Sequence, residues 1–400
     1  MMLKVMPYEK AVAAVAERFA KMSVAEQVKT SDAAGKICAE DVVSCETVPA
    51  FDRSTVDGYA VFHGETNAAS AASPAVFSLV GEVLMGQQAD FDADDGKCVY
   101  VPTGGMLPKG ADAVAMIEDA EKRGDEILLS KPLRIYENVT RKGEDIECGA
   151  AILKKGDVIN ACKAGALYAA GITCVKAVKR PRFYVISTGD ELVDCAEECP
   201  AGKVRDVNTG LLCAAANAWE FAGAERVTDD FELLSQALTR AEQVADVILL
   251  SGGSSVGIAD YTERLFAERG DLFLRGVAMK PGKPTLAAYR DGKLFVGLPG
   301  HPMAAYTAFR LIFERAYLRA AGAEKELFLR ARAAVNFAGG AGRSCVMPVR
   351  LFRENGEVFA APLFYKSGMI SVLAACDGFT VIADFEEGVQ KGEMLDIYGL

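Results

Sequence analysis

The spacing of apolar residues changes along the chain and predicts several kinds of segment. Over residues 8–22 apolar side chains recur at helical spacing, which predicts an amphipathic helix. Residues 50–175 hold short apolar runs between Gly- and Pro-containing turns, a pattern typical of short strands and loops. Short apolar runs return after residue 323 and predict a small C-terminal β-domain.

Between these β-rich parts, expected strands alternate with expected helices. Strands are expected at 182–187, 224–230, 245–250 and 293–300, and helices at 208–222, 231–245, 260–270 and 302–321. Asn208 or Thr209 is expected to cap the first helix, and Asp260 the third. This alternation implies parallel βαβ units in a doubly wound sheet, whose ligands bind at the carboxyl ends of the strands.

Composition narrows the class of protein. A chain of 400 residues implies roughly two to four domains, and 51% hydrophobic with 25% charged residues is ordinary for globular proteins. No window holds 18 uninterrupted apolar residues, and the N-terminus lacks the apolar core of a signal peptide. We therefore expect a cytoplasmic protein with no membrane span.

The net charge and the numbers of cysteine and histidine residues argue against nucleic-acid-binding, disulfide-rich and zinc proteins. The chain has 44 basic and 55 acidic residues, a net charge of −11 and no long basic run, which disfavours nucleic-acid binding. Eleven scattered cysteines without a C-x₂-C pair favour reduced thiols over a disulfide framework or zinc knot. Two histidines cannot build a zinc site of three imidazoles.

Polar loops follow the expected strands of the α/β segment, at 187–191, 228–230, 251–257 and 298–302. Glycines let the backbone approach an anion and turn N–H groups toward it, although a tight turn alone would also explain residues 251–257. At the carboxyl-end rim of the sheet, where these loops meet, four carboxylates would lie together: Asp229, Asp230, Asp260 and Glu191. Each aspartate could also be a simple helix cap. That many carboxylates beside a phosphate loop need a counter-ion, and hard oxygen donors suit Mg²⁺.

Lys280 and Lys283 stand in a segment stiffened by two prolines, which would hold two cations near one place. A flexible, solvated lysine pair is the alternative. Residues 51–60, 101–105 and 141–146 are dense polar stretches between apolar runs, and each by itself could be an ordinary turn.

Seven segments, in order, resemble the molybdopterin molybdenumtransferase family, which includes MoeA and the E domain of gephyrin. They are FDRSTVDGYA at 51–60, PTGG at 102–105, RKGEDI at 141–146, STGDEL at 187–192, SGGSSVG-x-x-DY at 251–261, KPGKP at 280–284 and GLPGHP at 297–302. One such motif is weak, but seven in the family's order are specific, and the resemblance covers nearly the whole chain.

The resemblance implies an elongated α/β multidomain subunit, with a doubly wound, mostly parallel α/β domain of the molybdopterin-binding type plus β-rich domains. The implied divisions are an N-terminal helix (1–24) packing on the α/β domain, a dimerising segment (25–45 and 141–177), a β-rich domain reaching the partner's site (46–140), the α/β domain (178–322) and a small β-domain (323–400). A homodimer is therefore expected.

The implied reaction takes adenylylated molybdopterin and molybdate, cleaves the phosphoanhydride with Mg²⁺, releases AMP and places molybdenum on the dithiolene. The resemblance implies that the catalytic residues are Asp57, Thr103, Asp145 and Glu191. It also implies that Glu191 and Asp260 bind the metal. The residues that the resemblance implies bind substrate are Ser187, Thr188, Gly189, Asp190, Asp230, Ser251, Gly252, Gly253, Ser254, Gly257, Lys280, Lys283, Pro299 and Gly300. Other proteins of cofactor biosynthesis are compatible partners; nucleic acids and membranes are not expected.

Some points stay open. His301 stands where the family more often has Asn, Asp229 rivals Asp230, and Arg343 and Ser367 are further candidates in the C-terminal domain. Molybdate and tungstate cannot be separated. Two alternatives are a molybdopterin adenylyltransferase, which shares the α/β unit but is often single-domain, and a non-enzymatic gephyrin-like scaffold, against which the intact carboxylate and glycine loops argue.

Overall fold

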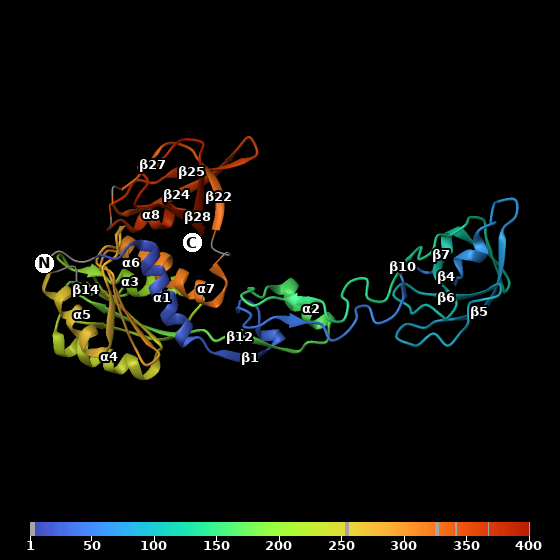
Figure 1. Cartoon of the computed structure of the whole chain (residues 1–400), viewed down its shortest axis with the longest axis horizontal. Helices are drawn as coiled ribbons and strands as arrows, with labels where there is room; N and C mark the ends of the chain where they lie inside the picture. The colour runs from blue at the N-terminus through green and yellow to red at the C-terminus, as the bar shows by residue number, and fades with distance from the viewer. Residues whose placement is uncertain (1–4, 253–255, 325–327, 341, 367, 400) are drawn as a thin grey trace.

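The computed structural model describes residues 5–252, 256–324, 328–340, 342–366 and 368–399. Figure 1 shows an elongated chain with a two-domain body at one end, a slender middle unit and a distal domain at the other end. The expected multidomain α/β fold is confirmed. Within the described ranges, no helix combines the length and the apolar character that crossing a membrane requires.

The α/β domain is built on a six-stranded sheet of order β16-β13-β17-β21-β20-β18. Four neighbouring strands are parallel: β16 (Glu220–Val227), β13 (Arg182–Thr188), β17 (Val247–Gly252) and β21 (Lys293–Leu298). Next to them β20 (Leu286–Arg290) runs antiparallel to β21, and β18 (Asp271–Arg275) pairs antiparallel with β20. Successive residues of β13, Val185 and Ile186, enter two apolar clusters on opposite faces. Both faces are therefore covered, as parallel sheets require.

Helices cover the two faces of this sheet. They are α3 (Val207–Ala215), α4 (Phe231–Val244) and α5 (Val256–Arg269), with α1 (Tyr8–Met22), α6 (Pro302–Ala308), the π-helix η4 (Phe309–Glu314) and α7 (Arg315–Ala321). The predicted helices at 8–22 and 302–321 are confirmed. Buried Arg315 ties α1 to α7, because it donates to the Tyr8 hydroxyl at 2.9 Å and pairs with Glu9 at 2.6 Å and Glu324 at 2.7 Å.

Two predicted helices differ from the structure. The helix expected at 208–222 ends at Ala215, because residues 220–227 form the edge strand β16 instead. Its N-cap is Asp206, whose carboxylate accepts the Thr209 N–H at 3.1 Å, so capping by Asn208 or Thr209 was wrong. The helix expected from 260 begins at Val256, which places Asp260 inside α5 rather than at its cap.

The middle unit is formed by two separated chain segments. It pairs β1 (Ala25–Lys29) with β12 (Cys174–Val178) and β2 (Val42–Val43) with β11 (Ala151–Leu153), and α2 (Ala161–Ala169) packs on the same small core. The 3-10 turn Thr30–Asp32 lies between its first two strands.

The distal domain is a six-stranded sheet of order β7-β4-β6-β5-β9-β8 with an apolar cluster on each face. Its strands are β4 (Gly58–Val61), β5 (Ala75–Glu82), β6 (Lys97–Val101), β7 (Ala113–Met116), β8 (Ala120–Arg123) and β9 (Glu126–Leu129), with 3-10 turns at His63–Thr66 and Ile117–Asp119. The chain enters and leaves through the antiparallel pair β3 (Arg53–Ser54) and β10 (Val139–Thr140).

The C-terminal β-domain packs on the α/β domain (Figure 1). Its elements are β22 (Phe328–Ala333), β23 (Phe337–Ala338), β24 (Ser344–Glu354), β25 (Glu357–Pro362), α8 (Ile370–Ala375), β26 (Gly378–Ile382), β27 (Gly388–Val389) and β28 (Met394–Gly399). One strand of its sheet, β19 (Met279–Lys280), comes from the α/β domain and pairs Lys280 with Cys345. The segment that carries the two predicted anion-binding lysines is therefore anchored between two domains.

Candidate functional site

Asp57 and Thr103 meet at the inner end of the distal domain. The Asp57 carboxylate accepts the backbone N–H of Thr103 at 2.6 Å and its hydroxyl at 2.9 Å. These two hydrogen bonds lower the pKa of Asp57, although the side chain is exposed. Asp57 is therefore a charged acceptor at neutral pH.

Backbone contacts bring a third motif to the same place. The N–H of Lys142 donates to Asp52 at 2.6 Å, and the N–H of Ser54 donates to the carbonyl of Gly105 at 3.0 Å. A Cβ on Gly58 would lie 2.0 Å from the carbonyl oxygen of Ala115, so only glycine lets β4 and β7 approach this closely. The segments 51–60, 102–105 and 141–146 thus form one cluster.

Asp145 lies in the third of these segments. Its side chain is exposed, and its N–H donates to the carbonyl of Val48 at 3.2 Å. The structure places it on the connection between the distal domain and the middle unit.

A second cluster lies at the carboxyl ends of β13 and β16. The Thr188 hydroxyl donates to the Asp229 carboxylate at 2.6 Å, and the N–H of Asp229 donates to Asp190 at 3.1 Å. Lys203 donates to the carbonyl of Asp190 at 2.6 Å. Asp230 instead accepts the N–H of Leu233 at 2.9 Å and caps α4. Of the two rival aspartates, Asp229 is the one that links the loops.

The loop after β17 joins this cluster through a close backbone approach. Gly252 has a φ of +145°, and a Cβ there would lie 2.2 Å from the carbonyl oxygen of Thr188. The buried Asn208 amide donates to the Ser251 hydroxyl and to the Gly300 carbonyl, each at 2.8 Å. Asn208 therefore connects the loops after β17 and β21.

Asn208 is a site residue that the sequence analysis missed. Its buried Oδ1 has no hydrogen-bond partner within the part of the chain that the structure describes, which leaves an acceptor beside the loops. Ser187, which was expected to bind substrate, is buried and instead bonds Asp206 at 3.1 Å and Thr209 at 2.8 Å. In the sequence Asn208 stood out solely as a candidate cap of the helix that follows β13.

The expected anion-binding lysines are both exposed. Gly282 between them has a φ of +116°, and its carbonyl accepts the Thr285 hydroxyl at 2.7 Å. No ion pair occupies Lys280 or Lys283 among the residues described. Their charges are available to an anion.

The expected metal ligands Glu191 and Asp260 are also exposed. Across the described ranges, no three His, Cys, Asp or Glu side chains form a group that could hold a metal. Mg²⁺ usually takes one or two protein carboxylates and completes its shell with phosphate oxygens and water. Two exposed carboxylates near the glycine-containing loops fit an ion of that kind.

The remaining candidates divide by position. Gly189 and Pro299 are buried beside the rim, while Gly300 is half-buried and Arg343 and His301 are exposed. Gly257 falls on the α5 backbone. Gly253, Ser254 and Ser367 lie outside the described residues.

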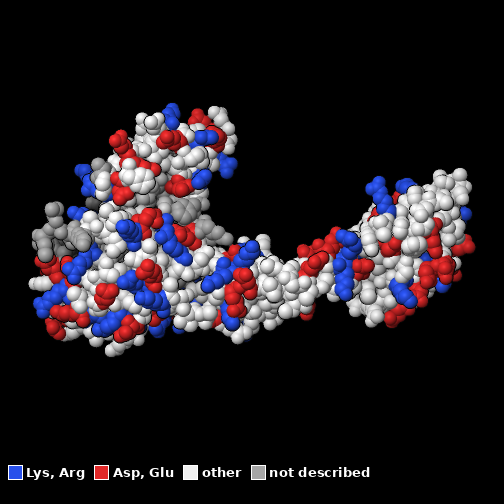
Figure 2. Space-filling view, viewed as in Figure 1, with Lys and Arg blue, Asp and Glu red and all other residues white. Residues whose placement is uncertain are grey.

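The two clusters lie far apart within one chain, because the distal domain stands at the far end of the slender middle unit (Figure 1). Figure 2 shows Lys and Arg interspersed with Asp and Glu over the visible face, without a broad basic surface. That face offers nothing typical of nucleic-acid binding.

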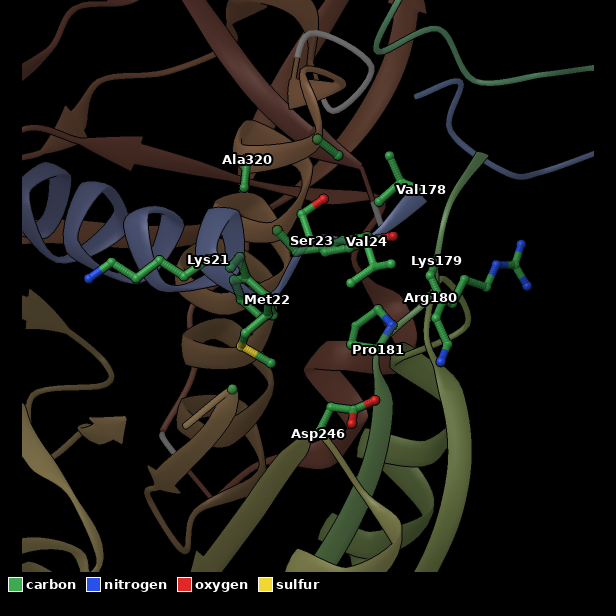
Figure 3. A pocket seen from close by; sticks show the side chains of 14 residues that line it. Lys21, Met22, Ser23, Val24, Val178, Lys179, Arg180, Pro181, Asp246 and Ala320 are labelled. Carbon is green, nitrogen blue, oxygen red and sulfur yellow. The ribbon is translucent and has the colours of Figure 1, made fainter. Parts of the chain in front are cut away.

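A pocket of about 280 Å³ lies at the opposite edge of the α/β sheet, where Met22, Val24 and Pro181 are among the lining side chains (Figure 3). Pro181 directly precedes β13 and Asp246 directly precedes β17, so the pocket is at the amino ends of the strands. Ligands of doubly wound sheets bind at the carboxyl ends. The loops, rather than this pocket, are therefore the candidate site.

Comparison with known proteins gives three family matches that together cover most of the chain. Family models match the MoeA N-terminal region (domain I and II) over residues 6–171, a probable molybdopterin binding domain over 184–319 and the MoeA C-terminal region (domain IV) over 330–400. A molybdopterin molybdenumtransferase of Staphylococcus aureus is 31% identical over 90% of this chain and 88% of its own length. One of Staphylococcus epidermidis is 28% identical over 92% and 90%.

Two solved structures of molybdopterin biosynthesis MoeA proteins from Pyrococcus horikoshii are also similar. One has a TM-score of 0.81 at 36% identity, covering 99% of both chains. The other has a TM-score of 0.82 at 27% identity, covering 99% of this chain and 100% of that one. The resemblance of the seven motifs is thus confirmed, and the chain belongs to the molybdopterin molybdenumtransferase (MoeA) family of molybdenum cofactor biosynthesis.

Proposed function

We propose that the protein inserts molybdenum from molybdate into adenylylated molybdopterin, with Mg²⁺-dependent cleavage of the phosphoanhydride and release of AMP. The observation that carries this proposal is the set of groups around the carboxyl ends of the α/β strands. Backbone loops that approach one another closely lie there with exposed carboxylates, on a domain of the molybdopterin-binding type.

The two exposed lysines suit a polyanionic substrate. Lys280 is held by the pairing of β19 with β24, and the turn at Gly282 separates it from Lys283. Because both ammonium groups reach solvent, they can neutralise molybdate or a phosphate through charge-assisted hydrogen bonds. The chain's net charge of −11 makes such a local cationic site necessary for an anion.

Glu191 and Asp260 are the carboxylates that would hold Mg²⁺. The ion would supply positive charge at the phosphate oxygens. The chain's own part is to present two exposed carboxylates, one after β13 and one in the first turns of α5. Asp57, kept ionised by the two hydrogen bonds from Thr103, would accept a hydrogen bond from a bound water or substrate group.

A homodimer would bring the two clusters together. A single chain holds the Asp57 cluster and the Glu191 rim at opposite ends, so a second copy must complete each site if both serve one reaction (Figure 1). A closed two-fold dimer would contain two such composite sites.

The direct test measures AMP released from adenylylated molybdopterin by the purified protein, with and without molybdate and Mg²⁺. Glu191→Gln and Asp260→Asn should each lower turnover by about a hundredfold or more, since each removes charge from the transition state. Asp291→Asn is the matched control, because Asp291 is exposed in the turn between β20 and β21.

The melting temperature distinguishes catalytic loss from structural loss. Parallel losses of melting temperature and turnover in Glu191→Gln and Asp260→Asn would contradict the metal-binding role. Adenylyl transfer from ATP to molybdopterin without molybdate would favour the adenylyltransferase alternative. Absence of either reaction would favour a scaffold.

A further inference from the structure

Two exposed cysteines meet on the stem of the distal domain, which we define as residues 44–49 and 143–150. The stem is the pair of chain segments that runs between the middle unit and the distal domain (Figure 1). There the Cys148 thiol donates to the backbone carbonyl of Cys45 at 3.4 Å. All eleven cysteines lie in the described ranges, and this is the one hydrogen bond there that joins two of them.

Backbone pairing sets the two cysteines opposite each other. The N–H of Ser44 donates to the carbonyl of Ala150 at 2.9 Å, and the N–H of Gly149 donates to the carbonyl of Ser44 at 2.7 Å. Two residues therefore oppose one, a β-bulge, and Gly149 has the positive φ, +88°, that such a bulge favours. The next residue on each segment is a cysteine. Residues opposite each other on antiparallel segments have Cα atoms roughly 4.5–5.5 Å apart, which is within the range that a disulfide spans.

The cysteines occupy a gap in the pairing of the stem. Beyond them, the N–H of Val48 donates to the carbonyl of Ile146 at 2.7 Å, and the N–H of Ile146 donates to the carbonyl of Val48 at 3.0 Å. Between this pair and Ser44, the described residues 45–47 and 147–148 share no backbone hydrogen bond across the stem. A covalent link between the two cysteines would therefore close the part of the stem that the backbone leaves open.

Exposure makes these two thiols available to a reagent. Cys38, Cys98 and Cys376 are buried, and burial raises the pKa of each of these thiols, which reduces the amount of reactive thiolate. Cys45 and Cys148 are both exposed to solvent. Across the part of the chain that the structure describes, no third His, Cys, Asp or Glu joins them as a metal site. An exposed cysteine beside a second cysteine is typical of a reversible disulfide in a reducing compartment.

We propose that Cys45 and Cys148 are a reversible oxidation site that clamps the stem and whose reactant is a low-molecular-weight disulfide. The thiolate of one cysteine attacks a sulfur of the reactant, so that one small thiol leaves and a mixed disulfide remains. The second cysteine then attacks the protein sulfur of this mixed disulfide, and the second small thiol leaves. Two protein thiols are oxidised to one disulfide, the reactant is reduced to two thiols, and the two protons end on the departing thiols. Neither step involves the molybdenum chemistry proposed above.

The disulfide acts as a clamp because of where it lies. It cross-links the two segments that attach the distal domain, so it limits local opening of the stem. A cross-link between residues this far apart in the sequence also removes conformations from the unfolded chain, which stabilises the folded state.

Oxidised glutathione added to the native full-length protein is the probe. Cleavage with trypsin and a glutamate-specific protease separates the two residues into the peptides 41–46 and 148–154, each of which contains one cysteine. After alkylation of the remaining thiols, mass spectrometry should find these two peptides joined, with two hydrogen atoms lost, and dithiothreitol should separate them. Amide hydrogen exchange of residues 45–48 and 146–148 should slow by about tenfold or more in the oxidised protein.

Single-cysteine variants distinguish the disulfide from simple glutathione adducts. Cys45→Ser and Cys148→Ser should each stop at the mixed disulfide with glutathione and keep the hydrogen-exchange rates of the reduced protein. Cys162→Ser is the matched control and should form the link normally, because Cys162 is an exposed cysteine on α2 of the adjoining middle unit.

Three results would overturn the proposal. In the first, both thiols of the wild type remain open to alkylation after treatment with oxidised glutathione. In the second, Cys45 or Cys148 is found only as a glutathione adduct, or linked to another cysteine or to a second copy of the chain. In the third, the expected link forms but hydrogen exchange in the stem is unchanged, which refutes the clamp.

Discussion

Mixing two inactive variants tests whether each site draws residues from two subunits. Asp57→Ala removes the carboxylate that Thr103 orients in the distal domain, and Glu191→Ala removes a carboxylate of the α/β rim. Both side chains are exposed, so neither substitution leaves a buried cavity or an unpaired buried charge, and both proteins should fold.

The expected recovery of activity depends on how the two defects are distributed between the two sites of a dimer. In a heterodimer with composite sites, one site receives both defects and the other receives neither. A statistical mixture holds about half heterodimers, so about a quarter of all sites should be intact. Each variant alone should show no more than background activity.

The assay is molybdate-dependent AMP release after subunit exchange, with exchange demonstrated by two differently tagged copies. Recovery near a quarter of wild-type turnover supports a site shared across the dimer. No recovery despite demonstrated exchange would place Asp57 and Glu191 in one subunit's site and refute the reasoning. A mixture of Glu191→Ala with Asp260→Asn is the control and should not recover, because both residues belong to the same domain.

Three further outcomes are expected. Lys280→Gln or Lys283→Gln should weaken substrate binding about tenfold and reduce its dependence on salt, and a loss below about threefold would favour solvated lysines. Burial raises the pKa of Glu314 to about 7, so the folded state binds more protons than the unfolded state between pH ~4.5 and 7. The free energy of unfolding should therefore fall by up to about 3 kcal/mol as pH rises through this window, and denaturant titrations of Glu314→Gln should lack that fall. Gly58→Ala would place its Cβ 2.0 Å from a carbonyl oxygen and should destabilise the distal domain by about 1–3 kcal/mol in thermal unfolding, whereas Gly165→Ala, with open space around it, should not.

Local patterns predicted the elements whose own sequence decides their structure. The helix at 8–22 is confirmed at both ends because its apolar stripe and polar face are complete. The strand predicted at 182–187 is confirmed within one residue as β13, because it is an apolar run buried on both faces. By contrast, residues 216–222 were expected to be helical, and pairing of β16 with β13 overrides that local preference.

The site could be predicted only in part, because its contacts join distant residues. The motif resemblance grouped Asp57 with Thr103, but the two hydrogen bonds between residues 46 positions apart follow from the β4–β6 register. Asn208 looked like a helix cap, and only the packed fold places its amide between Ser251 and Gly300. The spacing of residues along the sequence does not predict contacts between side chains this far apart in the chain.

The distal domain has its two chain ends side by side. The pairing of β3 with β10 is continued by the N–H of Thr55 donating to the carbonyl of Asn138 at 2.9 Å, and residues 48 and 146 form a bridge just outside it. A domain whose two chain ends lie side by side is an insertion into the middle unit. It can be deleted, and the two cut ends of the middle unit can be joined by a short linker, without disturbing the packing of the remaining domains. For the same reason the distal domain could be exchanged for that of a relative. The exchange would change the residues that the distal domain contributes to a site, while the other domains keep their own packing.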